Sequence, residues 1–172
     1  MGIKTITVDV NRVEKEKKVC EMEKILVAVD GSPTSMRAAR AAVEMARKFY
    51  ADLIFLSVVK NPDLLVRGRV GENYIYNLSN LEGELSHQYK EMLDEFVSQL
   101  PDLSNIAYEK IVKVGVPYDE IVKMAEKRGV DLIVIGRRGF SPLKRILLGS
   151  VSQNVVSHAK CPVMVVNDTE EH

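Results

Sequence analysis

Short apolar runs alternate with longer segments of mixed polarity over most of the chain. The first run, residues 25–29, reads Ile-Leu-Val-Ala-Val and contains no polar residue. Such a run is typical of a strand that is buried on both faces of a parallel sheet. Apolar runs and alternation together predict five strands, at residues 25–29, 53–59, 106–114, 131–135 and 162–166.

In the segments between these strands, apolar residues recur at the spacing of a helix. Ser32 is a suitable N-cap and Pro33 suits the first helical position, so a helix is expected from there to about Phe49. Strands that alternate with helices in this way predict a doubly wound α/β fold with a parallel sheet. Three further amphipathic helices are expected, namely a long one after residue 78 and shorter ones at residues 117–128 and 150–159.

Two parts of the chain do not follow this alternation. Residues 60–78 carry Pro62 and Gly71 and predict an irregular, functional or mobile connection, in which Tyr74 and Tyr76 either cover a crevice or pack. The N-terminal residues are expected to add an edge strand, to pair with a neighbouring chain or to be disordered. The chain therefore divides into an N-terminal extension of residues 1–23, one α/β domain of residues 24–167 and a tail of residues 168–172.

The composition argues against several classes of function. The 172 residues are 46% hydrophobic, and 24 basic side chains balance 24 acidic ones, so no overall field attracts nucleic acid or an anionic membrane. No apolar run approaches the roughly 18 residues that span a bilayer, and no apolar signal core is seen, so a cytoplasmic location is expected. The two cysteines, Cys20 and Cys161, are too few and too far apart for a disulfide scaffold or a zinc cluster.

Residues 136–150 lead from the fourth predicted strand into the last predicted helix and indicate an anion site. Gly136 and Gly139 lack a Cβ and allow the backbone to approach a ligand closely. Gly149-Ser150 begins the helix, where free N–H groups and the helix dipole favour negative charge. Four basic side chains and no acidic one lie between these ends, so this run is where a phosphate is expected.

Asp30, Val58 and Gly136 each stand near the carboxyl end of a predicted strand. In an open parallel sheet, ligands bind outside these ends at a switch in strand order, so the three residues face one crevice if the first and fourth strands are neighbours. Asp30 either accepts hydrogen bonds from ribose hydroxyls or helps to hold a metal there, or it merely caps the first helix.

Other polar residues near this region also have two interpretations. Ser152 is either a phosphate contact or ordinary helix surface, and Lys144 and Arg145 are interpreted as a solvated helical face. None of the three histidines has an acid or nucleophile partner nearby in the sequence, so no catalytic residue is proposed; they are His87, His158 and His172.

The glycine spacing and the strand ends together carry a resemblance to a known family. Gly136, Gly139, Gly149 and Ser150 match the pattern Gly-x2-Gly-x9-Gly-Ser/Thr, and Ala28-Val29-Asp30-Gly31-Ser32 and the segment from Ser157 to Val163 match as well. The chain from Lys24 to Asn167 resembles the ATP-binding subgroup of the universal stress protein family. The resemblance implies a three-layer α/β/α fold of the adenine nucleotide alpha hydrolase-like kind, a sheet of order 3-2-1-4-5 and a homodimer formed through residues 162–166.

The resemblance also implies where ATP, or AMP or ADP, would bind, with Mg²⁺ as a possible companion. Ala28 and Val29 would line the base pocket, Asp30 would meet the ribose, and the backbone of Val58 would bind adenine. The remaining contacts would surround the ribose and phosphates: Gly136 and Gly139 would border them, and Gly149, Ser150 and Val151 would hold the phosphate chain. Arg137 departs from the small polar residues common in the family, so it either strengthens the phosphate contact or obstructs it.

The function expected from these observations is that of a small cytoplasmic ATP-binding regulator or sensor of stress, with at most slow hydrolysis. Two alternatives stay open, a weak ATPase or self-phosphorylating protein and a nucleotide-free module that dimerises through its last strand. A response-regulator receiver fits poorly, because the first strand offers Asp30 alone and the third strand ends in Val114-Gly115 rather than in an aspartate.

Overall fold

The computed structural model describes residues 22–60, 72–101, 103–139 and 148–167. Within these ranges it has five strands, β1 (Lys24–Val29), β2 (Asp52–Lys60), β3 (Tyr108–Gly115), β4 (Leu132–Gly136) and β5 (Val163–Val166). The helices are α2 (Pro33–Phe49), α3 (Glu72–Ser98), α4 (Pro117–Arg128) and α5 (Ser150–His158). Each predicted strand is therefore present, with bounds that differ by one or two residues.

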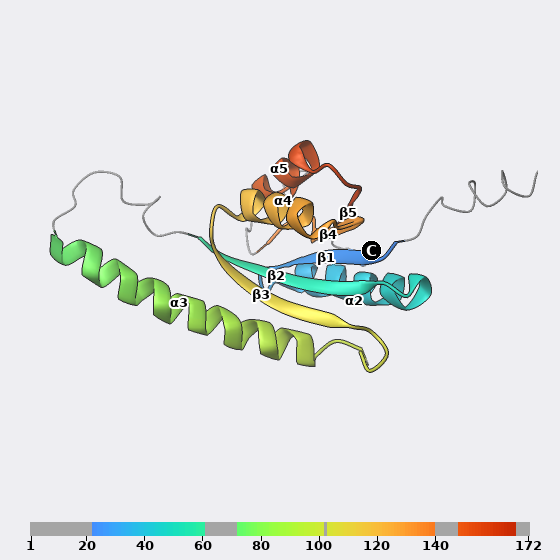
Figure 1. The fold of residues 1–172 in the computed structure, drawn as a ribbon, viewed down its shortest axis with the longest axis horizontal. Coiled ribbons are helices and arrows are strands. Elements are labelled where there is room, and N and C mark those ends of the chain that lie inside the picture. Colours follow the sequence, from blue (N-terminus) through green and yellow to red (C-terminus); the bar gives the residue numbers. More distant parts are fainter. Residues whose placement is uncertain (1–21, 61–71, 102, 140–147, 168–172) are drawn as a thin grey trace, which may run out of the picture.

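All neighbouring strands are parallel, and their order is β3-β2-β1-β4-β5. Figure 1 shows α4 and α5 on one face of the sheet and α2 and α3 on the other. The expected three-layer α/β/α fold and the expected strand order are both confirmed. Since β1 and β4 are neighbours, the chain crosses over between them, and the sheet has a switch in strand order at this point.

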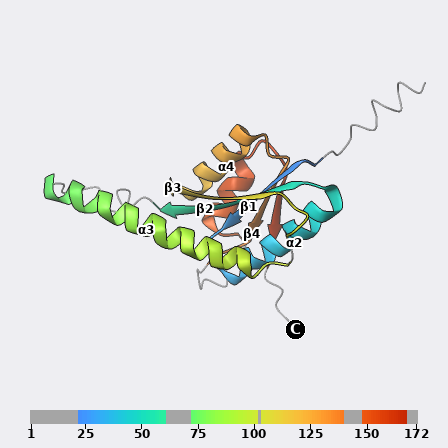
Figure 2. The same ribbon diagram turned by 60° about the horizontal axis from the view of Figure 1, so that its bottom comes forward.

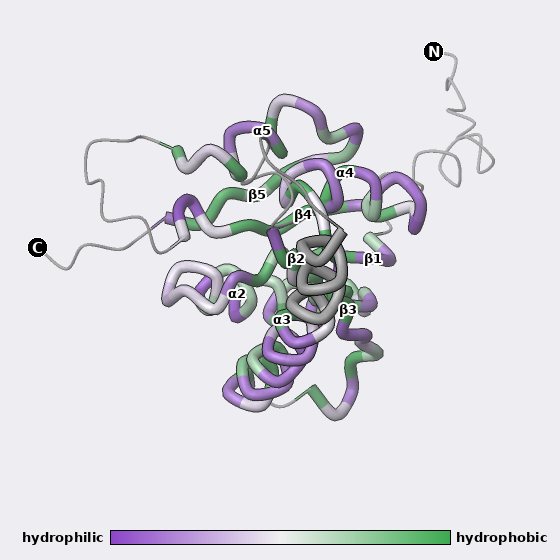
Figure 3. The backbone as a smooth tube through the Cα atoms, turned by 90° about the vertical axis from the view of Figure 1, so that its left-hand side faces the viewer, coloured by the Kyte–Doolittle hydropathy of each residue, from purple (hydrophilic) through white to green (hydrophobic). Residues whose placement is uncertain are grey.

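Alternate residues of the central strands supply two separate cores. Ile25 and Val27 pack on the side of α2 and α3, whereas Leu26 packs on the side of α4 and α5. All three side chains are fully buried, and each such burial contributes about 1.5–3 kcal/mol. Figure 3 shows β4 and β5 mainly in hydrophobic colours and the helices in mixed colours, as expected for amphipathic helices that cover a buried sheet.

The long helix α3 starts earlier than the sequence pattern predicts. Residues 72–78 were expected in the irregular connection, but they form the first turns of α3, which runs past the end of the sheet in Figures 1 and 2. Asparagine and aromatic residues in this segment have modest helix propensity, yet propensity is a weak guide where an apolar spacing continues.

Asp131 fixes the start of β1 at the amino end of the sheet. Its Oδ2 accepts hydrogen bonds from the backbone N–H groups of Glu23 and Lys24, each at 2.9 Å. Met22 packs against the core on the α2 side. Residues 1–21 of the N-terminal extension and the tail of residues 168–172 lie outside the described residues. No described helix is long and apolar enough to cross a membrane.

Candidate functional site

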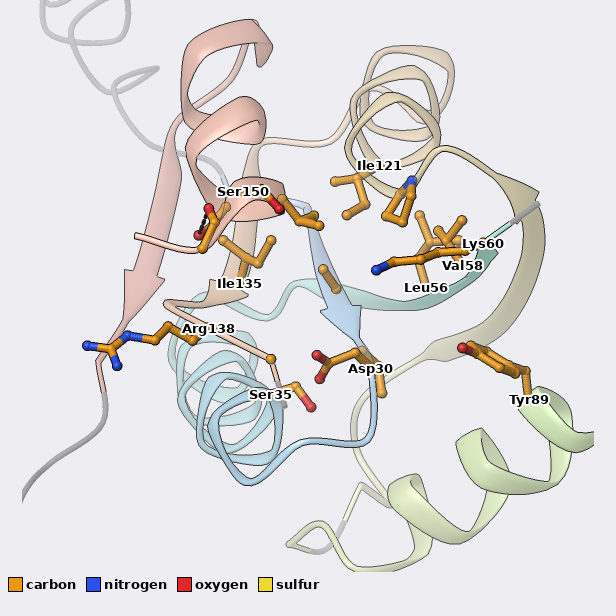
Figure 4. Close-up of a pocket in the computed structure, with 18 residues that line it drawn as sticks. Asp30, Ser35, Leu56, Val58, Lys60, Tyr89, Ile121, Ile135, Arg138 and Ser150 are labelled. Carbon is orange, nitrogen blue, oxygen red and sulfur yellow. Dashed lines mark hydrogen bonds between the residues drawn. The ribbon is translucent and has the colours of Figure 1, made fainter. Parts of the chain in front are cut away.

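A cavity of about 620 Å³ opens at the carboxyl ends of β1, β2 and β4. Figure 4 shows it bounded by these strand ends, by the start of α5 and by one side of α4. Its lining brings together residues far apart in the chain: Ala28, Val29, Asp30, Ser35, Leu56, Val58, Lys60, Tyr89, Pro117, Ile121, Ile135, Gly136, Arg138, Gly139, Gly149, Ser150, Val151 and Ser152. All the predicted site residues except Arg137 are among them.

Arg137 takes part in the site through its backbone. Its N–H donates to the carbonyl oxygen of Val166 at 2.7 Å, and its own carbonyl oxygen accepts from the N–H of Gly149 at 2.9 Å. The residue therefore links β5 to the start of α5. The next residue, Arg138, lines the cavity instead, and Figure 4 shows its guanidinium turned away from Asp30 and Ser150.

Asp30 holds the turn between β1 and α2. Its Oδ1 accepts hydrogen bonds from the backbone N–H of Ser32 at 3.0 Å and from the Ser32 hydroxyl at 2.6 Å. Ser32 is the N-cap, because its Oγ accepts from the N–H of Ser35 at 3.2 Å. Asp30 thus supports the cap without being the cap, and the residue stays exposed at the cavity. An exposed carboxylate at this place is a hydrogen-bond acceptor for a ligand's hydroxyl groups.

Gly136 and Gly139 are needed for close approach. A Cβ on Gly139 would lie 2.2 Å from Oδ2 of Asp30, and a Cβ on Gly136 would lie 3.1 Å from the backbone carbonyl carbon of Thr34. The first distance is far below a van der Waals contact. The two glycines therefore let the chain that leaves β4 lie directly against the start of α2, which closes one side of the cavity.

The N-terminus of α5 faces the cavity without a side-chain cap. Gly149 is its N-cap residue and makes no side-chain cap bond, and no acidic residue stands in the first turn. The first backbone N–H groups of a helix have no partner within the helix, and the dipole adds partial positive charge there. With Ser150 and Val151 in the lining, this end of the cavity suits an anionic group such as a phosphate.

Ser152 is buried and is not ordinary helix surface. The residue is 2% exposed, and its hydroxyl lies 2.9 Å from the carbonyl oxygens of both Arg137 and Gly149. This hydrogen bonding keeps the start of α5 attached to the end of β4. Although Ser152 lines the cavity, its visible role is to position the residues around it.

The opposite wall of the cavity is mainly apolar. Leu56 and Val58 come from β2, Ile121 from α4 and Ile135 from β4, and all four belong to or pack against the core on the α4 side. An apolar wall with polar groups at one end is the usual form of a site for a flat organic ring that carries a charged tail.

Lys60 and Tyr89 are among the lining residues that were not predicted from the sequence. Lys60 is the last residue of β2, and Tyr89 belongs to α3. The position of Lys60 at a strand's carboxyl end is a signal that could have found it. Tyr89 gave no such signal, because its place on an apolar helix face predicts core packing.

Other polar groups lie away from the cavity. His87 faces Glu91 on the exposed side of α3, and the Nδ1 atom of His158 is 2.8 Å from the carbonyl oxygen of Asn154. Burial raises the pKa of the Cys161 thiol. In the described part of the chain, no group of three or more His, Cys, Asp or Glu side chains is placed to hold a metal ion. Lys144 and Arg145 lie outside the described residues.

Comparisons with known proteins agree with this geometry. The model of the Universal stress protein family matches residues 21–167. Universal stress protein MJ0531 of Methanocaldococcus jannaschii is 36% identical over 146 residues, which cover 84% of this chain and 81% of that protein.

Solved structures show the same likeness. The structure of protein MJ0577 of Methanocaldococcus jannaschii matches with a TM-score of 0.73 at 29% identity, over 88% of this chain and all of that one. A universal stress protein from Archaeoglobus fulgidus in complex with dAMP matches with a TM-score of 0.56 at 26% identity, over 84% of this chain and 97% of that one.

Proposed function

The chain belongs to the universal stress protein family, and on that premise we propose that it binds an adenine nucleotide in the cavity at the carboxyl ends of β1, β2 and β4. The proposed physiological ligand is ATP, and the proposed role is that of a nucleotide-dependent regulator or sensor in a stress response. The complex of the Archaeoglobus fulgidus relative with dAMP supports this class of ligand.

The observation that carries the proposal is that an uncapped helix N-terminus and an apolar wall face each other across one cavity. The phosphates would lie at Gly149, Ser150 and Val151, where backbone N–H groups point at the ligand. The base would lie along Ala28, Val29 and Val58, where apolar side chains cover its faces. These two ends are charged and apolar respectively, as the two ends of a nucleotide are.

The ribose would lie between these ends, near Asp30. Its exposed carboxylate would accept hydrogen bonds from ribose hydroxyls, with Oδ1 already engaged by Ser32. Mg²⁺ prefers oxygen ligands and retains several waters, so a bound ion would take most of its ligands from phosphate and water. Asp30 is the one carboxylate in the described lining that could add to them.

Hydrolysis of the bound nucleotide would be slow at most. A general base has to lie within hydrogen-bond reach of the attacking water. Neither described histidine, His87 or His158, lines the cavity, and the carboxylate that does line it, Asp30, is bound to Ser32 and assigned to the ribose. Holding and releasing the nucleotide would therefore be the regulatory event.

Dimerisation through β5 is a second part of the proposal. β5 is an edge strand of the sheet, and Met164 on it is 37% exposed. An edge strand presents unpaired backbone groups that a second copy can bind. The test is the mass in solution, which should be that of a dimer for the natural chain and that of a monomer for Met164→Asp.

Denaturing the purified protein and identifying any nucleotide released from it is the most direct experiment. We expect ATP, ADP or AMP in the supernatant, and binding of added labelled ATP with Mg²⁺ after the site has been emptied. Purified protein that releases no nucleotide and binds no ATP at millimolar concentration would contradict the proposal. The nucleotide-free interaction module would then be the better interpretation.

A further inference from the structure

The lining of the cavity contains a cation and a phenol that the glycine pattern does not include. Lys60 ends β2, and Tyr89 comes from α3. Figure 4 shows the ammonium end of Lys60 and the hydroxyl end of Tyr89 pointing toward the cavity, whereas the guanidinium of Arg138 is turned away. Lys60 is therefore a positive side-chain charge that reaches the ligand space.

Lys60 lies on the side of the cavity that is remote from the proposed phosphate site. The strand order places β1 between β2 and β4, so the strands of Lys60 and Gly136 are separated by about 10 Å. α5, which begins with Ser150, packs over α4 and β5 rather than over β2. A ligand whose phosphates lie at Ser150 would extend across β1 and reach Lys60 with its other end.

Lys60 also lies on the same face of its strand as the apolar wall. Side chains two apart along a strand share a face, so Leu56, Val58 and Lys60 line one side of the cavity in succession. The register pairs Lys60 with Gly115 of β3, and the side chain of Glu120 from α4 lies against Gly115. The aliphatic stem of Lys60 thus extends the apolar wall, and its ammonium group ends the wall with a charge.

The chemistry of these two groups suits the edge of a purine. A lysine ammonium has three donors and no acceptor, and a tyrosine hydroxyl can donate as well. Purine rings present acceptor nitrogens along their edges. A bond from a charged donor to a neutral acceptor in a partly closed site is stronger than one between neutral groups.

We propose that Lys60 and Tyr89 recognise the base end of the nucleotide, and that Lys60 makes no contact with its phosphates. This inference rests on the proposed function, because it assumes that phosphates occupy the start of α5. It adds specificity residues to a site whose glycine pattern recognises only the ribose and phosphates.

The experiment compares three ligands that share parts of one molecule. ATP, adenosine and inorganic tripolyphosphate are each competed against labelled ATP on the natural chain, Lys60→Met and Tyr89→Phe. Lys113→Met serves as the control, because Lys113 is an exposed lysine of the neighbouring strand that does not line the cavity. Methionine keeps the length of the lysine stem, and phenylalanine removes the hydroxyl alone.

We expect Lys60→Met to lower the affinities for ATP and for adenosine by the same factor, about tenfold, and to leave the affinity for tripolyphosphate unchanged. Tyr89→Phe should lower the affinities for the same two ligands by a few-fold, and Lys113→Met should leave all three affinities unchanged. A loss confined to ATP and tripolyphosphate would place Lys60 at the phosphates and overturn the inference. Unchanged adenosine affinity in both variants, or no adenosine binding by a natural chain that binds ATP, would also overturn it. If the natural chain binds no ATP, the proposed function itself fails.

Discussion

Two helices begin beside the same cavity, and their N-termini are built in opposite ways. At the start of α2, Ser32 caps the helix, Asp30 holds Ser32, and the hydroxyl of Ser35 donates back to the carbonyl oxygen of Ser32 at 2.8 Å. At the start of α5, Gly149 makes no side-chain cap bond. Both helices follow a strand of the same parallel sheet, so their dipoles point the same way.

The difference shows how one fold can assign a structural and a binding role to equivalent positions. An N-terminus whose donors are satisfied by its own side chains offers little to a ligand. An N-terminus with glycine as its cap keeps these donors for an anion, with partial positive charge behind them. The helix start with the weaker internal capping is therefore the one that suits the phosphates.

The strongest way to break this difference is to give α5 the cap that α2 has. In Gly149→Asp, the carboxylate would accept the free N–H groups of α5 and repel a phosphate, so ATP affinity should fall by about 30-fold or more. Thermal stability should stay equal or rise slightly, because aspartate exceeds glycine as an N-cap by about 0.3 kcal/mol. Titration with labelled ATP and thermal unfolding measure the two effects.

Gly149→Ala is the matched control for that substitution. Either new Cβ would lie 3.2 Å from the carbonyl oxygen of Arg137, so both variants need the same small adjustment, but alanine brings no acceptor. Its ATP affinity should stay within about threefold of that of the natural chain. Equal losses in the two variants would show that space, rather than the free N–H groups, matters at this position.

Gly139→Ala tests the close approach of residue 139 to Asp30, the residue that binds the N-cap of α2. The new Cβ would lie 2.2 Å from Oδ2 of Asp30, so the carboxylate would have to turn and would weaken its hydrogen bonds with Ser32, and we expect a loss of about 1 kcal/mol in the free energy of unfolding. In an Asp30→Ala background the same change should cost less than about 0.5 kcal/mol. Denaturant unfolding of the single and double variants measures this coupling, and simple additivity would count against it.

The smallest effects are expected from the first serine of each helix region. Ser32→Ala removes the α2 cap and should lower the free energy of unfolding by about 1 kcal/mol, with little change in ATP affinity. Ser150→Ala should do the reverse, weakening ATP by about threefold to fivefold while stability stays the same. The opposite pattern, with stability lost at Ser150 and affinity lost at Ser32, would invert the assigned roles.

The elements of the fold could be predicted well because the signals for them are local. Apolar runs mark the strands, Ser32 and Pro33 mark the start of α2, and Gly129 ends α4 in the left-handed conformation with φ of 60°. The strand order followed from a family resemblance and not from these patterns. The predicted start of α3 was wrong, because the first turns of this helix contain residues of modest helix propensity.

The site was harder to predict where a residue's part in it depends on the direction of its side chain and on the packing of distant elements. A loop sequence does not show which side chain faces a cavity, and so Arg137 was chosen although Arg138 lines it. Arg137 continues the pairing with β5, which fixes its backbone and leaves the lining to its neighbour. Tyr89 could not be found because it reaches the cavity from the helix on the other face of the sheet.

Asp131 has a practical consequence for anyone who wants to tether or label the protein. Its carboxylate fastens the backbone of Glu23 and Lys24 at the amino end of β1, whereas Asp30 and the cavity stand beyond the carboxyl end of the same strand. A fluorophore or surface linker joined just ahead of Met22 would therefore pull on an anchored point, about 20 Å from the ligand. A label attached there should leave ligand binding in the cavity unchanged.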